Sequence, residues 1–245
     1  MIHMGTSTIP QGGAALGLGS TAAPRIVHNT LIGGPSTGGI VGALWLQGGT
    51  TAAVVQNNIL TGSGNAPQAS GLLLSCPADS GPFFLASFQD NLVFGVPGGL
   101  LDWSECAGTG SYPTVDAMTA ELNSVQAGIA AGNVTVSSSC GTDSGCVATP
   151  SCTGQAACLA DVFYGFDPTT LGYANLFPAS LFAGTCPAAA TFPSGNGWPI
   201  AATPPCLVAR SALNDSNNVS KDLYGNCRSD AGPTMGAAEY TGGCR

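Results

Sequence analysis

A repeat of 28 residues in the first part of the chain constrains the fold more than any other feature. Leu16, Leu44, Leu72 and Leu100 lie at equal intervals of 28 residues, each inside a short apolar element. A second element follows the first three copies, and its central residues are Val27-His28-Asn29-Thr30, Val55-Gln56-Asn57-Asn58 and Phe88-Gln89-Asp90-Asn91. Such self-similarity predicts a solenoid, in which stacked neighbours bury one another's apolar face.

The spacing also predicts which residues stack in columns. Besides the four leucines, a second apolar column is expected to hold Leu18, Leu46 and Leu74. Two polar columns are expected, one made of Asn29, Asn57 and Asp90 and the other of Thr30, Asn58 and Asn91. Asn suits tight turns and can hydrogen-bond along a column. The third copy of the second element comes five residues late, which places an insertion within residues 75–82.

If the leucine columns point inward, the column between them points outward. That outer column is expected to hold Gly17, Trp45, Leu73 and Leu101. An exposed apolar row needs a cover. Either the C-terminal segment, about residues 159–208, lies over the row, or a partner does. The uncapped start of the repeats near Gly12 likewise calls for upstream residues, a ligand or self-association, end to end or face to face.

The repeats over residues 12–103 resemble the right-handed parallel β-helix family with pectate-lyase-like repeats. Asp222-Leu223-Tyr224-Gly225-Asn226-Cys227-Arg228, followed by Gly236-Ala237-Ala238-Glu239, is similar to the closing segment of many secreted bacterial β-helix proteins. The resemblance implies an all-β fold, a right-handed parallel β-helix solenoid. It does not specify an activity, because this fold hosts lyases, hydrolases, adhesins and passive surface proteins.

The remainder of the chain is expected to pack on the solenoid. We predict coils over residues 1–112 and a disulfide-rich, irregular C-terminal segment over 113–245, both parts of one structural unit. A short helix is predicted from Thr114 to Val125, because Thr114 suits an N-cap and an apolar face recurs at helical spacing. That face consists of Val115, Met118, Leu122 and Val125.

Ten Cys indicate disulfides rather than metal sites. Cys140, Cys146, Cys152 and Cys158 are each six residues apart, whereas zinc sites usually show tighter Cys pairs. Which Cys pairs with which cannot be read from the sequence. Disulfides predict a secreted or cell-surface protein. Residues 1–5 have no signal-peptide pattern, so the chain is expected to be part of a longer one.

The charge balance excludes some functions. The chain has 5 basic and 13 acidic residues, a formal charge of −8, and only 7% charged residues. Nucleic-acid binding needs a basic patch that so few Lys and Arg cannot build. No apolar run approaches the roughly 18 residues of a membrane span. Scarce basic residues also argue against a polyuronate lyase, which needs a base and usually Ca²⁺. Apart from this Ca²⁺, no cofactor or metal site is predicted.

Three carboxyl groups are candidates for catalysis. Asp102 and Glu105 flank Trp103, and Asp90 lies in the repeat. Paired carboxylates about 5–10 Å apart can hydrolyse a glycosidic bond. The alternative interpretation is structural: Asp90 fills a place in the polar column, and Asp102 marks the end of the core. The sequence does not settle whether the chain is an enzyme.

Three further residues are candidates for substrate binding. Trp45 and Trp103 are predicted as stacking surfaces for a sugar ring. His28 is predicted to share an outward polar column with Gln56 and Gln89, where it either binds substrate or is simply solvated.

The leading hypothesis is a β-helix protein that binds or processes a polysaccharide, as a hydrolase, a lyase or a binder. A non-catalytic surface or adhesion module is the alternative. Ice binding is a weaker one, because the Thr column of Thr21, Thr50 and Thr51 breaks at Asp79. Asn133-Val134-Thr135 also matches an N-glycosylation pattern.

Overall fold

The structure is a computed structural model of the whole chain. It describes residues 2–3, 13–35, 41–63, 66, 68–75, 85–104, 110–163, 222, 228 and 235–236. Strands dominate the described part, and most belong to three sheets whose strands are parallel except for one antiparallel edge pair. The predicted all-β class with parallel strands is therefore confirmed. The described strands form parallel sheets but no closed solenoid, so they do not by themselves establish a right-handed β-helix.

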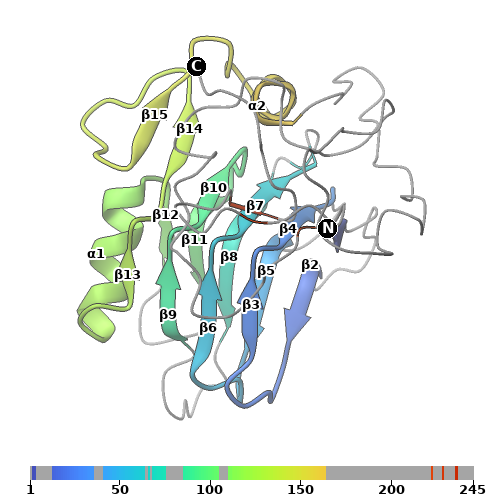
Figure 1. Cartoon of the computed structure of the whole chain (residues 1–245), viewed down its shortest axis with the longest axis vertical. Coiled ribbons are helices and arrows are strands. Elements are labelled where there is room, and N and C mark those ends of the chain that lie inside the picture. Colours follow the sequence, from blue (N-terminus) through green and yellow to red (C-terminus); the bar gives the residue numbers. More distant parts are fainter. Residues whose placement is uncertain are drawn as a thin grey trace.

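Each turn of the repeat contributes one strand to each sheet, in the same order (Figure 1). Sheet 1 contains β2 (Gly13–Leu18), β5 (Val41–Gln47), β8 (Ala69–Ser75), β11 (Gly99–Ser104) and the antiparallel β12 (Gly110–Tyr112). Sheet 2 contains β3 (Arg25–Val27), β6 (Ala53–Gln56), β9 (Leu85–Gln89) and β13 (Ala130–Ala131). Sheet 3 contains β1 (Ile2–His3), β4 (Thr30–Gly33), β7 (Ile59–Gly62) and β10 (Leu92–Phe94).

The register of sheet 1 confirms the predicted columns for the first three repeats and corrects the fourth. Leu16, Leu44 and Leu72 pair across β2, β5 and β8. The fourth member is Leu101, not Leu100, because the spacing lengthens by one residue before β11. This shift moves every later residue of β11 to the opposite face from the one predicted, since side chains alternate along a strand.

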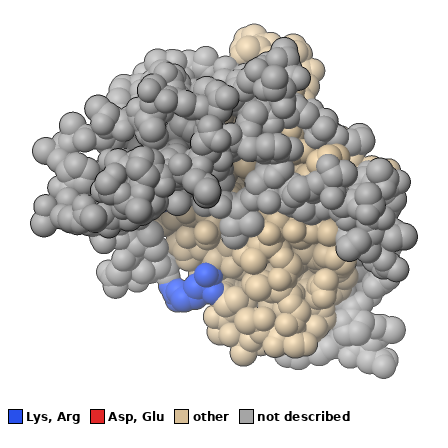
Figure 2. Space-filling view, turned by 90° about the vertical axis from the view of Figure 1, so that its right-hand side faces the viewer, with Lys and Arg blue, Asp and Glu red and all other residues tan. Residues whose placement is uncertain are grey.

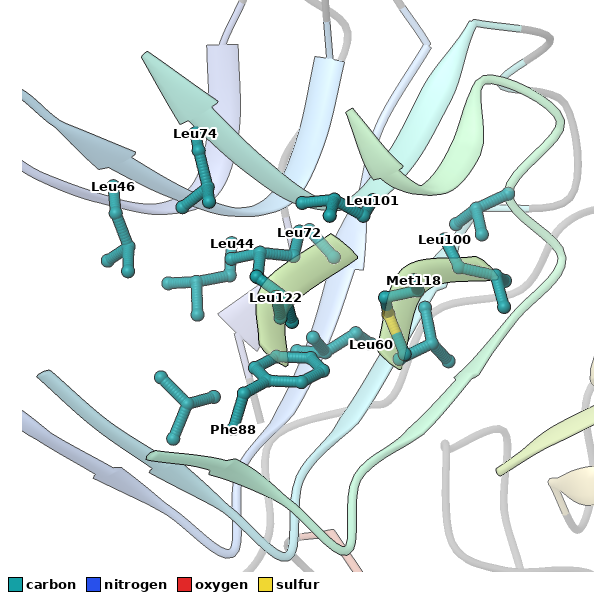
Figure 3. Close-up of a cluster of buried hydrophobic side chains, with 14 of the residues drawn as sticks. Leu44, Leu46, Leu60, Leu72, Leu74, Phe88, Leu100, Leu101, Met118 and Leu122 are labelled. Carbon is teal, nitrogen blue, oxygen red and sulfur yellow. The ribbon is translucent and has the colours of Figure 1, made fainter. Parts of the chain in front are cut away.

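The core lies between the three sheets. Leucines of β5 and β8 in sheet 1 face Phe88 of sheet 2 and Leu60 of sheet 3 (Figure 3). The fully buried side chains of this group are Leu44, Leu46, Leu60, Leu72, Leu74 and Phe88. One turn cannot enclose such a core alone, so stacked turns bury it between them. Each Å² of apolar surface buried in this way stabilises the fold by about 25 cal/mol.

The polar turn after sheet 2 carries a ladder of four asparagines, Asn29, Asn58, Asn91 and Asn133. Each of the first three donates its backbone N–H to the Oδ1 atom of the next, at 2.8–3.1 Å. The side-chain amides of Asn58, Asn91 and Asn133 in turn donate to the backbone of the preceding repeat, at the carbonyl oxygens of Ile26, Val55 and Phe88. The predicted alignment of Asn58 with Asn91 is confirmed, but the first repeat was misplaced by one residue, since Asn29 and not Thr30 aligns with Asn58.

The residues just before the ladder form a column of left-handed backbone. His28, Asn57, Asp90 and Gly132 have φ values of 55°, 58°, 51° and 64°. Repeated αL geometry turns each strand of sheet 2 into sheet 3, and Asn, Asp and Gly adopt it most readily.

α1 (Val115–Val125) confirms the predicted helix. The Thr114 side chain accepts the Ala117 N–H at 3.2 Å, and Val115, Met118 and Leu122 are buried. Val125 is 46% exposed, so its predicted place on the apolar face was wrong. The helix packs against β11, β12 and β13, the last strands of sheets 1 and 2 (Figure 1).

The disulfide loop after β14 (Thr135–Ser137) is tied to the start of α1. The Asp143 carboxylate accepts the backbone N–H groups of Val115 and Asp116, at 2.9 and 3.1 Å. Asp116 in return accepts the Ser144 hydroxyl at 2.6 Å, and this hydrogen bonding holds the pKa of Asp116 below its usual value. Carboxylates near a helix N-terminus are favoured by its free N–H groups and dipole.

Among the described residues there are two disulfides, Cys140–Cys146 and Cys152–Cys158, which confirms the prediction for these four Cys. They lie around β15 (Cys146–Ala148), which pairs with β14, and at α2 (Gln155–Val162). The other six Cys lie outside the described residues. Among the described helices, neither is long and apolar enough to cross a membrane.

Sheet 3 is buried on both faces. Its outward residues Ile59, Leu92 and Phe94 are 0% exposed. Phe163, just after α2, stacks against Phe94 with ring centroids 6.1 Å apart. Gly236 lies against Ile59 and donates its N–H to the Asn57 carbonyl oxygen at 2.7 Å.

The described residues of the predicted closing motif, Asp222, Arg228 and Gly236, are all buried. The Arg228 guanidinium donates to the Gly236 carbonyl oxygen at 2.8 Å, so it joins the two parts of the predicted closing motif. Glu239 lies outside the described residues. Phe163 and Gly236 therefore cover part of sheet 3. The sequence predicted that either the C-terminal segment or a partner would cover the outer face of sheet 1. Most of residues 159–208 lies outside the described residues.

Candidate functional site

The outer face of sheet 1 carries a row of residues in register across four strands. The row consists of Gly17, Trp45, Leu73 and Asp102, one each from β2, β5, β8 and β11. The sequence predicted this row but placed Leu101 at its end. The one-residue shift before β11 replaces that leucine with a carboxylate. We call these four residues the outer row.

Trp45 is the aromatic member of the outer row. Its ring is half-buried, and its indole Nε1–H donates to the Ser75 hydroxyl of the neighbouring strand. This hydrogen bond fixes the ring against the sheet while part of the ring stays exposed. A fixed, half-exposed indole is a suitable surface for the apolar face of a sugar ring.

Asp102 is the charged member of the outer row. Ser70, on β8, lies with its hydroxyl 3.5 Å from Oδ2 of Asp102. Partial burial raises the pKa of Asp102, and the Ser70 hydroxyl opposes that effect. Since neighbouring strands lie about 4.8 Å apart, the Cα atoms of Trp45 and Asp102 are separated by about 10 Å. Leu73 between them is 1% exposed, whereas Trp45 and Asp102 are both partly exposed.

Trp103 was wrongly predicted as a sugar platform. It pairs with Leu74 and extends the inward column of Leu18, Leu46 and Leu74. Only 4% of its surface is exposed, and it belongs to the main core. The indole therefore stabilises the last repeat from inside.

His28 was also wrongly placed. It aligns with Asn57 and Asp90 instead of Gln56 and Gln89, because Val27 is the residue that pairs with Gln56. The ring is 4% exposed, and its Nε2 lies 3.2 Å from the Asn57 side-chain amide. Because an amide nitrogen can only donate, Nε2 is the acceptor in this contact. His28 is part of the buried turn, and it is not positioned to bind substrate.

Asp90 lies at the turn between sheets 2 and 3, in the left-handed column. Desolvation raises its pKa from the ordinary value of 3.8 to about 6. Its backbone N–H donates to the Ala131 carbonyl oxygen at 3.0 Å, and Gly132 lies against its carboxyl group. This agrees with the structural alternative, in which Asp90 fills a place in the polar column.

The described carboxyl groups are not brought together as a catalytic pair. Asp102 projects from the outer face of sheet 1, whereas Asp90 lies at the end of β9 in sheet 2. Glu105 lies outside the described residues. Within the described ranges, no group of three His, Cys, Asp or Glu side chains could hold a metal ion. No residues are therefore assigned to Ca²⁺.

Ser70 and Ser75 support the outer row, although the sequence interpretation did not single them out. Ser75 directly follows Leu74 and alternates with the buried Leu72 and Leu74, which was a usable signal for an outward polar residue. Ser70 has the same parity as these leucines, so alternation alone would not have identified it. Two other hypotheses from the sequence do not fit the structure. Ice binding would need an exposed Thr column, but Thr50 is buried and donates to the Leu18 carbonyl oxygen. N-glycosylation would need an exposed Asn133, but Asn133 is buried in the asparagine ladder.

The side of the molecule on which β2 and β3 lie faces the viewer in Figure 2. Its described atoms are uncharged apart from one small basic area, and Arg25 of β3 is exposed.

Compared with protein-family models, curated proteins and solved structures, the chain shows no significant match.

Proposed function

We propose that this chain is a right-handed parallel β-helix of a secreted or cell-surface protein, and that it binds a neutral polysaccharide along the outer row. The β-helix assignment is supported by the order in which successive strands visit the three sheets. Crossovers between parallel strands of one sheet are almost always right-handed, which favours that hand. The disulfides support an oxidising compartment.

The observation that carries the binding proposal is the register of Trp45 and Asp102 on one face. A polysaccharide lying across the strands would place one sugar ring on the indole and hydroxyl groups of another ring near the carboxylate. Aromatic stacking with a few polar contacts is how flat protein surfaces bind sugars.

A neutral glycan suits this surface better than an acidic one. The chain has a formal charge of −8, and the charged member of the outer row is itself an acid. A polyuronate would meet repulsion from both, with no cation among the four row residues to offset it.

Binding without cleavage is the simpler proposal, because Asp90 and Asp102 lie on different sheets. A glycosidase would need a second carboxyl group within about 10 Å of Asp102. The second candidate, a non-catalytic adhesion module that binds a protein, is favoured by the same observation.

The experiment is a pull-down of the full chain on insoluble neutral and acidic polysaccharides, followed by affinity measurement on the best one. Trp45→Ala should weaken binding about tenfold or more, as expected for loss of an aromatic anchor. Trp45→Phe should retain most of it. Val125→Ala, which changes an exposed apolar residue on α1 outside the outer row, is the control.

Asp102→Asn should preserve binding to a neutral glycan, since the amide can still hydrogen-bond. Absence of binding to every glycan by the folded wild-type chain would refute the proposal and leave the adhesion module. Release of reducing ends that Asp102→Asn abolishes would instead show a catalytic role.

A further inference from the structure

A pocket of about 360 Å³ lies away from the outer row, where the repeats meet the disulfide-linked region. Its walls come from the turn after β10, the start of α1, β14 with the loop that follows it, and the first turn of α2. Both disulfides line it, so two of its walls are covalently braced. A volume above 300 Å³ is in the range of sites for small ligands.

The floor of the pocket is apolar and fixed. Val96, Leu100 and Val136 line it and are 5–8% exposed. Gln155 braces the wall formed by α2, since its amide nitrogen donates to the Ala66 and Gly95 carbonyl oxygens, both at 2.8 Å. The pocket is therefore held in one shape by hydrogen bonds from two different segments.

The rim of the pocket is rich in hydroxyl groups. Ser138, Ser139 and Thr153 line it and are exposed. Hydroxyl groups can both donate and accept, so they suit a partner that also carries hydroxyl groups.

The pocket offers no free ionic group to a charged ligand. Its described lining holds one carboxylate, Asp143, and neither Lys nor Arg. That carboxylate already accepts two backbone N–H groups at the start of α1. An anion would find no cation here, and a cation would compete with the helix for Asp143.

We propose that this pocket binds an uncharged, polyhydroxylated ligand of the size of one or two sugar rings. Such a ligand has apolar C–H faces for Val96 and Val136 and hydroxyl groups for the serine-rich rim. The inference does not depend on the outer row, because the two sites share no residue.

The test uses the full, oxidised chain and a panel of neutral monosaccharides and disaccharides at millimolar concentration, read by ligand-observed NMR. Gly154→Trp should abolish binding, because Gly154 lines the pocket and an indole at this position would fill it. The chain should tolerate the change, since a Cβ atom at Gly154 would meet no atom within 4 Å. Ser151→Trp, at an exposed neighbouring position outside the lining, should bind as wild type.

A second variant keeps the proposal testable if Gly154→Trp does not fold. Ser138→Ala combined with Ser139→Ala should weaken binding by about tenfold, the effect of losing one or two hydrogen bonds. The same measurements are repeated on the Trp45→Ala chain, which lacks the indole of the outer row, so that sugar bound in this pocket is read separately from sugar bound on the outer row. Absence of binding by wild type, or wild-type binding by folded Gly154→Trp or by the double serine variant, would overturn the proposal.

Discussion

Asn58 donates both its backbone N–H and its side-chain amide to the same Oδ1 atom of Asn91, at 3.0 and 2.9 Å. The two residues come from adjacent repeats, and both are 0% exposed. The pair joins the two repeats through side chain and backbone at once, in a place that water does not reach.

Asn91→Ala should therefore be strongly destabilising. The change leaves the buried Asn58 backbone N–H without its acceptor and removes the side-chain hydrogen bonds to Asn58 and to the Val55 carbonyl oxygen, so the free energy of unfolding should fall by about 3 kcal/mol. Asn29→Ala, at the half-buried end of the ladder, should cost only about 1 kcal/mol. Urea unfolding followed by circular dichroism measures both, and equal losses would contradict the cooperative ladder.

Substitution of Trp103 and of Trp45 should affect stability to different degrees. Trp103→Ala removes a core indole and should cost about 3–5 kcal/mol. Trp45→Ala changes an outward, half-buried ring and should cost about 1 kcal/mol. Thermal unfolding of both variants checks the inward and outward assignment, which would be reversed if Trp45→Ala were the more damaging change.

Gly71 marks a close approach between repeats. A Cβ atom there would lie 2.1 Å from Cγ1 of Val93 and 2.8 Å from the Leu100 carbonyl oxygen. Gly71→Ala should therefore cost about 2–3 kcal/mol through overpacking. Gly17→Ala, in the same sheet, would meet nothing within 4 Å and should change stability by less than about 0.5 kcal/mol. Denaturant midpoints compare the two, and a stable Gly71→Ala would refute this packing.

The raised pKa of Asp90 should appear as a pH dependence of stability. Between about pH 3.8 and 6 the folded chain keeps a proton that the unfolded chain has lost, so the free energy of unfolding falls as pH rises. Because Asp90 is half-exposed, the loss should be only about 1 kcal/mol. Asp90→Asn matches the Asn57 of the preceding repeat and should remove this loss.

Urea unfolding of wild type and Asp90→Asn at pH 4 and pH 7 tests this. The variant should gain stability relative to wild type at pH 7 and much less at pH 4. The same difference at both pH values would mean that the Asp90 carboxyl group is not desolvated.

The sequence predicted the parallel sheets and the sheet 1 columns of the first three repeats because the spacing in that sheet is constant. It misaligned Asn29 because Val27 pairs with Gln56, one residue beyond the 28-residue step. It misplaced β11 because one residue is added between β8 and β11, and a single residue reverses which side chains face inward. Trp103 was consequently predicted on the outer face, where Asp102 is found instead. No local pattern near Pro97 and Gly98 indicates whether the extra residue belongs to the turn or the strand.

The fourth asparagine of the ladder was missed for a different reason. Ala130, Ala131 and Asn133 match the second element, but the whole of α1 separates them from the third copy. The spacing therefore no longer repeats, and the two alanines offer little apolar signal. The pocket between the repeats and the disulfides could not be predicted either, because it depends on how distant segments pack.

The asparagine ladder has a direction: each asparagine after Asn29 accepts a hydrogen bond from the repeat before it and donates its side-chain amide back to that repeat. Each rung thus presents the same acceptor to one side and the same donor to the other. The ladder fixes the register between successive turns, even where the connections between them differ in length. A turn duplicated or deleted from one asparagine to the next would meet the same hydrogen-bonding groups on both sides. Changing the number of turns would thus preserve this joint, and it offers a route to longer or shorter versions of the chain.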